Sequence, residues 1–271
     1  MLFPVPPALV LAVHGSAAPA AAATVGRLAR NVEGLCGVAP VIGHLDHEEP
    51  SLATALGRAA ESGHTRAVVV PLLLGDGYHR TVDVPAVVEA AGDGLDCVLT
   101  EGLSGEQDVA LALYGRLREA ECRAGERADA IVLAAAGSSR RGGNDGAKVA
   151  ADQLRTLLDD ERGPVPLVPA YCSAAEPTVP DAITVLRWAG HQRIVVVPHL
   201  LAPGRFTDAL ASSGADTVAD PVADHPRIAR IVVARYESAL RARTPATANG
   251  VTSGRRPAAG RDRRRQPARQ G

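Results

Sequence analysis

Three polar residues that can bind metals or carry protons follow apolar runs in the first half of the chain. His14, Asp46 and His79 each stand at or shortly after the end of such a run. Ligands of open parallel sheets bind outside the carboxyl ends of the strands, so we expect these side chains at one edge. Two imidazoles and a carboxylate suit a divalent first-row metal, and a site without thiolates is open and exchangeable. Imidazoles also titrate near neutral pH, so the cluster fits a metal site, a proton-accepting pair, or both.

An internal repeat separates this chemistry from the scaffold. The matching segments are Val10–Ser16 with Val132–Ser138 and Val68–Leu74 with Val195–Leu201. At the positions of the three polar residues the second copy has Ala136, Ser173 and Phe206. Residues kept in both copies are therefore expected to serve the scaffold, and we predict one active site, in the first half.

The residues around Asp46 are harder to orient. If extended geometry lasts that far, His44 and Asp46 point to the same face of the sheet, because side chains alternate along a strand. Glu49-Pro50 recurs as Glu176-Pro177, which indicates a helix start with Pro50 in the first turn.

Apolar runs alternate with helix-like segments, which predicts an α/β fold of two tandem domains, each a parallel four-stranded sheet flanked by helices. Strands are expected at Ala8–Val13, Pro40–Leu45, Ala67–Leu74, Leu95–Leu99, Ala130–Ala135, Val165–Tyr171, Arg193–Leu201 and Asp216–Val218. Helices are expected at Ala20–Val32, Ser51–Ser62, Val84–Ala91, Glu106–Cys122, Lys148–Asp159, Val179–Ala189 and Pro226–Arg241. The helix at Glu106–Cys122 is predicted to close the first domain.

The predicted domains span residues 1–124 and 129–243, with a hinge at Arg123–Asp129. Residues 244–271 are rich in Arg, Pro, Gly and Ala and are predicted to be a disordered basic tail. The repeat places two halves in one chain and could replace a homodimer, so a monomer or weak dimer is expected.

Bulk composition limits the partners and the compartment. A formal net charge of −1 predicts no general attraction to nucleic acid or to an anionic membrane. No apolar run is long enough to cross a bilayer, and the start of the chain lacks the basic residues of a secretory signal. The four cysteines stand far apart without a CxxC pair, which favours a reduced, cytoplasmic setting.

An arginine-containing loop in the second half offers a possible anion site. Gly137–Gly143 resembles a phosphate loop but lacks the Walker spacing and a following Lys-Ser/Thr, so no nucleotide is expected. Arg140 and Arg141, together with Arg205, would form an anion-attracting rim if the halves face each other. The alternative is that these arginines are simply solvated.

Four motifs in fixed order resemble the sirohydrochlorin chelatase family of class II chelatases. The motifs are His14-Gly15-Ser16, Leu45–Leu52, Val70–His79 and Asp83-Val84-Pro85. The resemblance covers most of residues 8–241, with a degenerate second half. It implies two flavodoxin-like domains that face each other across a cleft. It also implies insertion of Fe²⁺, Co²⁺ or Ni²⁺, as the metal substrate, into the tetrapyrrole sirohydrochlorin without ATP.

The resemblance also assigns roles to residues. His14 and His79 match the two histidines of the family and would present the metal and accept pyrrole protons. Asp46 stands where many members have Glu and would orient or charge the site. Ser16 and the arginines at 140, 141 and 205 would hold the substrate. Alternatives are a non-catalytic metal or tetrapyrrole carrier, a flavodoxin-like ligand-binding module, and a chelatase for another tetrapyrrole.

Overall fold

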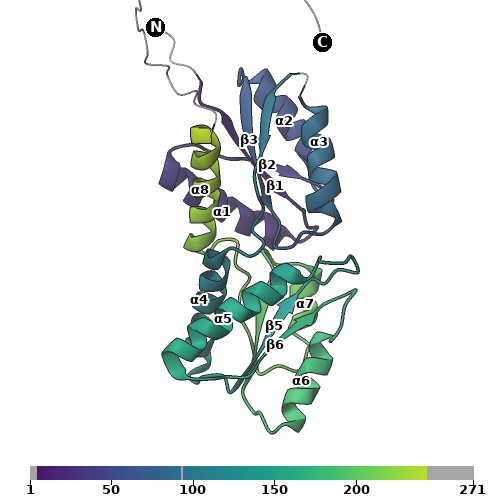
Figure 1. The fold of residues 1–271 in the computed structure, drawn as a ribbon, viewed down its shortest axis with the longest axis vertical. Helices are drawn as coiled ribbons and strands as arrows, with labels where there is room; N and C mark the ends of the chain where they lie inside the picture. Colours follow the sequence, from purple (N-terminus) through teal and green to yellow (C-terminus); the bar gives the residue numbers. More distant parts are fainter. Residues whose placement is uncertain (1–4, 93, 243–271) are drawn as a thin grey trace, which may run out of the picture.

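The computed structural model describes residues 5–92 and 94–242 and contains two four-stranded parallel sheets. The strand orders are β2-β1-β3-β4 and β6-β5-β7-β8, so the second half repeats the topology of the first (Figure 1). The predicted fold class is confirmed. The predicted basic tail at 244–271 lies outside the described residues.

The strands fall close to the predicted positions. They are β1 (Ala8–Val13), β2 (Val41–His44), β3 (Arg66–Leu72), β4 (Asp96–Leu99), β5 (Ala130–Ala135), β6 (Leu167–Tyr171), β7 (Ile194–His199) and β8 (Thr217–Val218). The helices are α1 (Pro19–Cys36), α2 (Leu52–Glu61), the π-helical turn η1 (His79–Asp83), α3 (Val84–Ala90), α4 (Gln107–Ala124), α5 (Asp145–Arg162), α6 (Val179–Trp188), α7 (Arg205–Leu210) and α8 (Pro226–Ala242). The sequence did not predict η1 or α7.

Both faces of each sheet are buried, which explains the nearly unbroken apolar strands. In β1, Leu9 and Leu11 face one core while Val10 faces another, as a period of two requires. The core that contains Leu9 and Leu11 also contains Ile131 and Leu133 of β5. The two halves are therefore joined by one continuous core.

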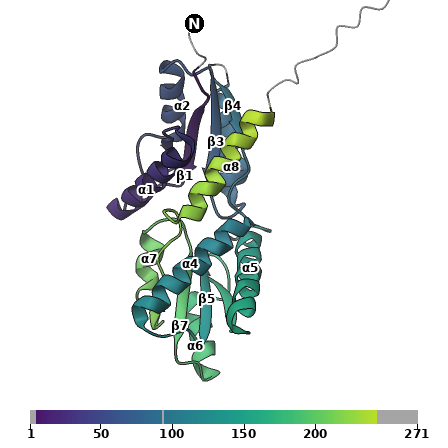
Figure 2. The same ribbon diagram turned by 90° about the vertical axis from the view of Figure 1, so that its left-hand side faces the viewer.

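The last helix of each half packs on the other half. The helix α4 contacts α5, β7 and β8, whereas α8 contacts α1 and β3. Figure 2 shows α4 across the second sheet and α8 beside β3. The hydroxyl of Tyr236 in α8 donates a hydrogen bond of 2.7 Å to the carbonyl of Pro7, ahead of β1. The prediction that Glu106–Cys122 closes the first half is therefore wrong.

Because α4 and α8 are exchanged, each packing on the opposite half, the connections between the halves do not lie where the sequence predicts. The chain passes to the second half between β4 and α4, at residues 100–106, and returns between β8 and α8, at residues 219–225. The predicted hinge at Arg123–Asp129 instead joins two elements of the second half, α4 and β5. An ion pair of 2.7 Å between Arg27 of α1 and Asp224 binds the second connection, residues 219–225, to the first half.

The turn before α2 differs from the prediction. Pro50 precedes the helix, and Ser51 is the N-cap, whose hydroxyl accepts a hydrogen bond from the amide of Thr54. The carbonyl of Pro50 accepts the amide hydrogen of His44, so this residue extends the end of β2. Pro177 accepts from Tyr171 in the same way, so the recurring Glu-Pro pair serves the scaffold of both halves.

No helix among residues 5–92 and 94–242 is long and apolar enough to cross a membrane.

Candidate metal and tetrapyrrole site

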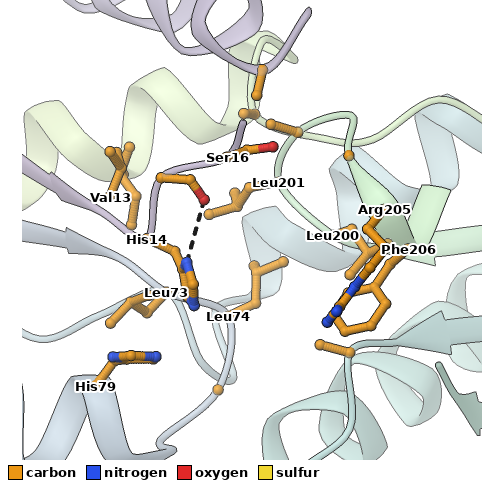
Figure 3. A pocket seen from close by; sticks show the side chains of 18 of the residues that line it. Val13, His14, Ser16, Leu73, Leu74, His79, Leu200, Leu201, Arg205 and Phe206 are labelled. Carbon is orange, nitrogen blue, oxygen red and sulfur yellow. Dashed lines mark hydrogen bonds between the residues drawn. The ribbon is translucent and has the colours of Figure 1, made fainter. Parts of the chain in front are cut away.

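A cavity of about 920 Å³ lies between the two halves. Its lining includes the loops after β1, β2 and β3 in the first half and the loops after β5 and β7 in the second. Figure 3 shows His14 and His79 on one side of the cavity and Arg205 and Phe206 on the other. The carboxyl ends of both sheets thus face one shared space, as the strand-end argument predicts for the first.

The structure brings the two predicted histidines together. The ring centroids of His14 and His79 are 4.5 Å apart, with the rings edge to face. The carbonyl of Gly15 lies 3.3 Å from Nδ1 of His14. Two imidazoles at this separation can act on one ion or one substrate nitrogen.

The π-helical turn η1 determines how His79 is presented. Nδ1 of His79 lies 2.7 Å from Oδ2 of Asp83, a pair four residues apart in this turn. A carboxylate at Nδ1 holds the proton there, and so leaves Nε2 unprotonated and free to bind a metal. The sequence motif contained Asp83, but its contact with His79 was not predicted.

We expect Asp83→Asn to lower metal affinity and turnover by roughly 10-fold or more, because carboxylates that orient a metal-binding imidazole contribute about 10–100-fold. The side-chain amide that this substitution introduces can donate a hydrogen bond to Nδ1 of His79 and thereby move the imidazole proton to Nε2. Binding of Co²⁺, followed by absorption, together with insertion rates, measures the effect. Glu89→Gln on the exposed face of α3 is the control for loss of one carboxylate. Equal affinities in the two variants would contradict the positioning role.

The environment of His14 favours its neutral form. Burial lowers the pKa of His14 below its usual 6.5, and the nearby His79 lowers this pKa further. The carbonyl of Gly15 and the carboxylate of Asp46 raise it, but the lowering causes dominate. A neutral imidazole can bind a metal or accept a proton, and His14 keeps this form to lower pH than a free histidine.

The loop that carries His14 is held by backbone contacts that both halves share. Gly15 has φ +93°, and a Cβ atom there would lie 1.9 Å from the carbonyl oxygen of Asp46. Gly137 has φ +90°, and its Cβ would lie 1.8 Å from the carbonyl oxygen of Ser173. Only glycine fits either position, so the repeated glycines are scaffold, as predicted.

Asp46 does not line the cavity. Its Oδ1 accepts the amide hydrogen of His47 at 2.8 Å, and its side chain is 57% exposed. The strand β2 ends at His44, so the extended geometry that would align His44 with Asp46 stops too early. Glu48 lines the cavity instead, and its Oε1 accepts the amide hydrogen of Ser16 at 2.8 Å. The expected placement of Asp46 beside both histidines is therefore corrected.

A third imidazole, His47, joins the cluster. Its φ of 64° lies in the left-handed region, and its ring stacks on that of His14 with centroids 5.9 Å apart. A positive φ at a non-glycine residue is uncommon and is not readable from a single sequence. Across residues 5–92 and 94–242, no group of three His, Cys, Asp or Glu side chains is arranged to hold a metal ion.

The remaining predicted residues divide between the cavity and the surface. Ser16 and Arg205 line the cavity, and the Arg205 guanidinium lies 5.1 Å from the centroid of the Phe206 ring. Arg140 and Arg141 are exposed and are not part of the cavity lining. One arginine of the expected rim therefore faces the cavity, and the other two do not.

His199 is a cavity residue that the sequence did not identify as one. It ends β7, is only 5% exposed, and occupies the position of Leu72 in the first half. The repeat matches His199 with an apolar residue, Leu72, so nothing in the sequence pointed to a functional side chain there. Burial lowers the pKa of His199 from 6.5 to about 4, so it is neutral at physiological pH.

This buried imidazole should make the protein less stable as the pH falls. Between pH 6.5 and pH 4 the unfolded chain binds a proton at His199 and the folded chain does not, so acid favours unfolding. The lowered pKa of His199 makes the free energy of unfolding about 3 kcal/mol smaller at pH 4 than at neutral pH. We expect His199→Leu to flatten the pH dependence of the free energy of unfolding, measured in urea at pH 7, 6 and 5. Parallel curves for the variant and wild type would contradict this assignment.

Solved structures share the fold of this chain. SirB from Bacillus subtilis with Fe³⁺ has a TM-score of 0.71 and 19% identity, and the match covers 86% of this chain and 95% of SirB. The sirohydrochlorin chelatase SirB from Bacillus subtilis subspecies spizizenii in complex with cobalt has a TM-score of 0.66 and 19% identity, with the same coverage of both chains. At this identity the comparison shows the fold alone, which this chain shares with SirB over nearly all of the SirB chain.

The sequence identifies the family. A family model described as CbiX matches residues 8–120 and again residues 130–239, so this chain belongs to the CbiX family. A sirohydrochlorin cobaltochelatase of Methanopyrus kandleri is 37% identical over 82 residues, which are 30% of this chain and 57% of that protein. The chain thus matches a little over half the length of this curated relative.

Proposed function

We propose that this chain catalyses the insertion of a divalent metal into sirohydrochlorin. The observation that carries the proposal is the pair His14 and His79, 4.5 Å apart on one wall of a cavity of about 920 Å³. A cavity of this volume is at the upper end of the range for small-molecule and cofactor sites, as a tetrapyrrole requires. Membership of the CbiX family and the name of the methanogen relative support the same substrate.

The reaction exchanges one metal ion for two pyrrole protons. Two N–H bonds break, their electron pairs remain on the nitrogens, and those nitrogens bind the metal as it loses water ligands. No atom is oxidised or reduced. His14 and His79 can hold the ion through unprotonated ring nitrogens, and each nitrogen can accept a pyrrole proton as the ion leaves it for the tetrapyrrole. Two protein ligands bind an ion more weakly than three or four, so the metal can leave for the tetrapyrrole.

The second half would hold the substrate. Arg205 lies on the wall opposite the histidines, and its guanidinium can pair with a carboxylate of the tetrapyrrole. The ring of Phe206, in place of a histidine, offers an apolar surface beside it. This division leaves the chemistry to the first half and substrate orientation to the second.

We propose Co²⁺ and Fe²⁺ as the metals to test first. The relative of Methanopyrus kandleri is named a cobaltochelatase, and SirB structures contain Fe³⁺ or cobalt. Imidazole ligands accept either metal, and their intrinsic affinities follow the general order of the divalent ions. Cellular choice then depends on metal supply and geometry rather than on ligand type.

The test is an anaerobic incubation of catalytic amounts of the protein with sirohydrochlorin and either metal, followed by absorption. We expect many turnovers per protein molecule, at a rate well above that of the uncatalysed reaction. A spectral change limited to one equivalent of protein would instead indicate a carrier. No acceleration with either metal would overturn the proposal.

A further inference from the structure

His199 brings a polar side chain to an apolar part of the cavity. In β7, Val195 and Val197 belong to the core that the two halves share, and the alternation of side chains places His199 on the same face of the strand. The matching residue of the first half, Leu72, belongs to that core as well. Because His199 also lines the cavity, it stands where the shared core meets the cavity.

The shared core forms one wall of the cavity, which we call the back wall. Its residues belong both to this core and to the cavity lining, and they are Val13, Leu72, Leu74, Ala135, Ala147 and Ala223. In the view of Figure 3, Leu74 lies between the two histidines on one side and Arg205 and Phe206 on the other. A flat substrate that lies between those two sides therefore turns one of its edges toward the back wall.

The ring of His199 is buried and has no partner. Within residues 5–92 and 94–242, no group forms a hydrogen bond with it. Neither of its ring nitrogens is among the fully buried, unpartnered polar atoms of these residues, so both nitrogens reach accessible surface, which is that of the cavity. A second buried histidine of the cavity differs in this respect, since Nδ1 of His44 lies 3.1 Å from the carbonyl oxygen of Pro50.

The surroundings of His199 carry no charge. Burial is the one cause that lowers its pKa, so no charged group of the described residues acts on this imidazole. A neutral imidazole still offers one N–H donor. A carboxylate that reached an apolar wall without a donor would be desolvated and unpaired, which is costly. His199 supplies the donor that such a carboxylate needs.

We propose that His199 donates a hydrogen bond to a carboxylate on the edge of the tetrapyrrole that meets the back wall, and so makes the site selective for acidic tetrapyrroles. The inference rests on the proposed function, because it describes how the same cavity recognises its substrate. Sirohydrochlorin carries acetate and propionate side chains on each of its rings, so every edge brings a carboxylate. Protoporphyrin carries its carboxylates along one edge, and its other edges are apolar.

Burial makes His199 better suited to this selection than Arg205. Arg205 is exposed, so water competes with the substrate for its guanidinium. His199 is only 5% exposed, and a substrate that fills the cavity removes the water beside it. A substrate without a matching group then leaves a buried donor unpaired, and a site of this kind discriminates strongly against such a substrate.

The variant His199→Leu removes the donor at a position where the fold accepts leucine. Leu72 pairs with Val13 in the first sheet as His199 pairs with Ala135 in the second. We expect the Kd for sirohydrochlorin, measured by absorption at pH 7 without metal, to rise about 10-fold, as for loss of a hydrogen bond to a charged group. The KM for Co²⁺ should not change.

The variant His199→Asn separates the hydrogen bond from the shape of the side chain. Asparagine retains a side-chain N–H, so it should restore most of the affinity for sirohydrochlorin that leucine loses. His191→Leu is the matched control, because His191 lies in the second half near Asp129 and outside the cavity. This control should bind sirohydrochlorin as wild type does.

Protoporphyrin tests the selectivity. We expect its Kd for His199→Leu to equal or fall below that for wild type, because the apolar edge loses no partner and no donor is left unpaired. The ratio of the two Kd values, protoporphyrin to sirohydrochlorin, should therefore fall at least about 10-fold in this variant. If protoporphyrin binds to neither protein, the comparison of His199→Leu with His199→Asn decides.

Three outcomes would overturn the role of His199. They are an unchanged Kd for sirohydrochlorin in His199→Leu, equal losses of affinity in the leucine and asparagine variants, and equal losses for both tetrapyrroles. Since binding is measured without metal, it is independent of insertion. A wild type that binds sirohydrochlorin but inserts no metal would refute the proposed function, and weaker binding by His199→Leu would then still support the role of His199.

Discussion

Replacement of His14 or His79 by alanine is expected to reduce metal insertion at least about 100-fold, the lower range for loss of a general base. Each variant loses one metal ligand and one proton acceptor. The ring centroids of His14 and His79 are only 4.5 Å apart, so both imidazoles can act on the same ion, and loss of either removes half of this pair. The reduction should appear in turnover at saturating metal and saturating tetrapyrrole.

The fold should survive these changes. The second half already has Ala136 at the position of His14, and the same backbone hydrogen bond forms in both halves. The amide of Asp46 donates to the carbonyl of His14 at 2.9 Å, and the amide of Ser173 donates to the carbonyl of Ala136 at 3.0 Å. We therefore expect the free energy of unfolding of His14→Ala to stay within about 1 kcal/mol of wild type.

The control for the loss of an imidazole is His191→Ala, in the second half near Asp129 and outside the cavity. Insertion rates and urea unfolding should be measured for all three variants. Near wild-type insertion by both His14→Ala and His79→Ala would refute the proposed mechanism. Equal losses in His191→Ala would show that the assay reports stability rather than chemistry.

The parts of the fold that repeat were predictable from sequence. The strands within runs such as Val68–Leu74 and Val195–Leu201 are buried on both faces, so the runs are apolar apart from His199 and easy to recognise as parallel strands. Where each run ends, the chain must leave the sheet at the same edge, which placed His14 and His79 together. These inferences depend on strand ends, which the apolar pattern marks clearly.

The position of Asp46 depended on backbone geometry that the pattern does not encode. His47, just after β2, has φ 64° in the left-handed region, and the matching Ala174 of the second half has φ 55°. In this loop the ring of His47 lines the cavity and the carboxylate of Asp46 does not. A strand-end argument places the loop at the cavity but does not show which of two neighbouring side chains faces it.

The exchange of α4 and α8 was hidden for a different reason. Amphipathic periodicity shows that a helix buries one face, but it does not show which sheet receives that face. Both α4 and α8 follow the last strand of a half and have suitable apolar residues, so the local assignment looked sufficient. Long-range packing decides between the two sheets, and a single sequence carries little signal for it.

A chain that ends at Ala124 should therefore fail to fold, although it contains the first half of the repeat. Truncation removes α8, whose Ile228, Ile231, Val232 and Tyr236 are buried. It also exposes the face of α4 that packs on the second sheet. Burial of four such side chains contributes roughly 6–12 kcal/mol, comparable to the whole stability of about 5–15 kcal/mol of a domain.

Circular dichroism, thermal unfolding and size-exclusion chromatography of the fragment measure this outcome. We expect no cooperative transition, together with aggregation through the uncovered apolar faces. Co-expression with residues 126–242 supplies α8 and the second sheet, and should restore a cooperative transition and metal insertion. A monomeric fragment with a cooperative transition of its own would contradict the exchange. Restoration of the cooperative transition and of metal insertion by the second fragment would support the exchange. It would show that each half supplies a helix to the core of the other.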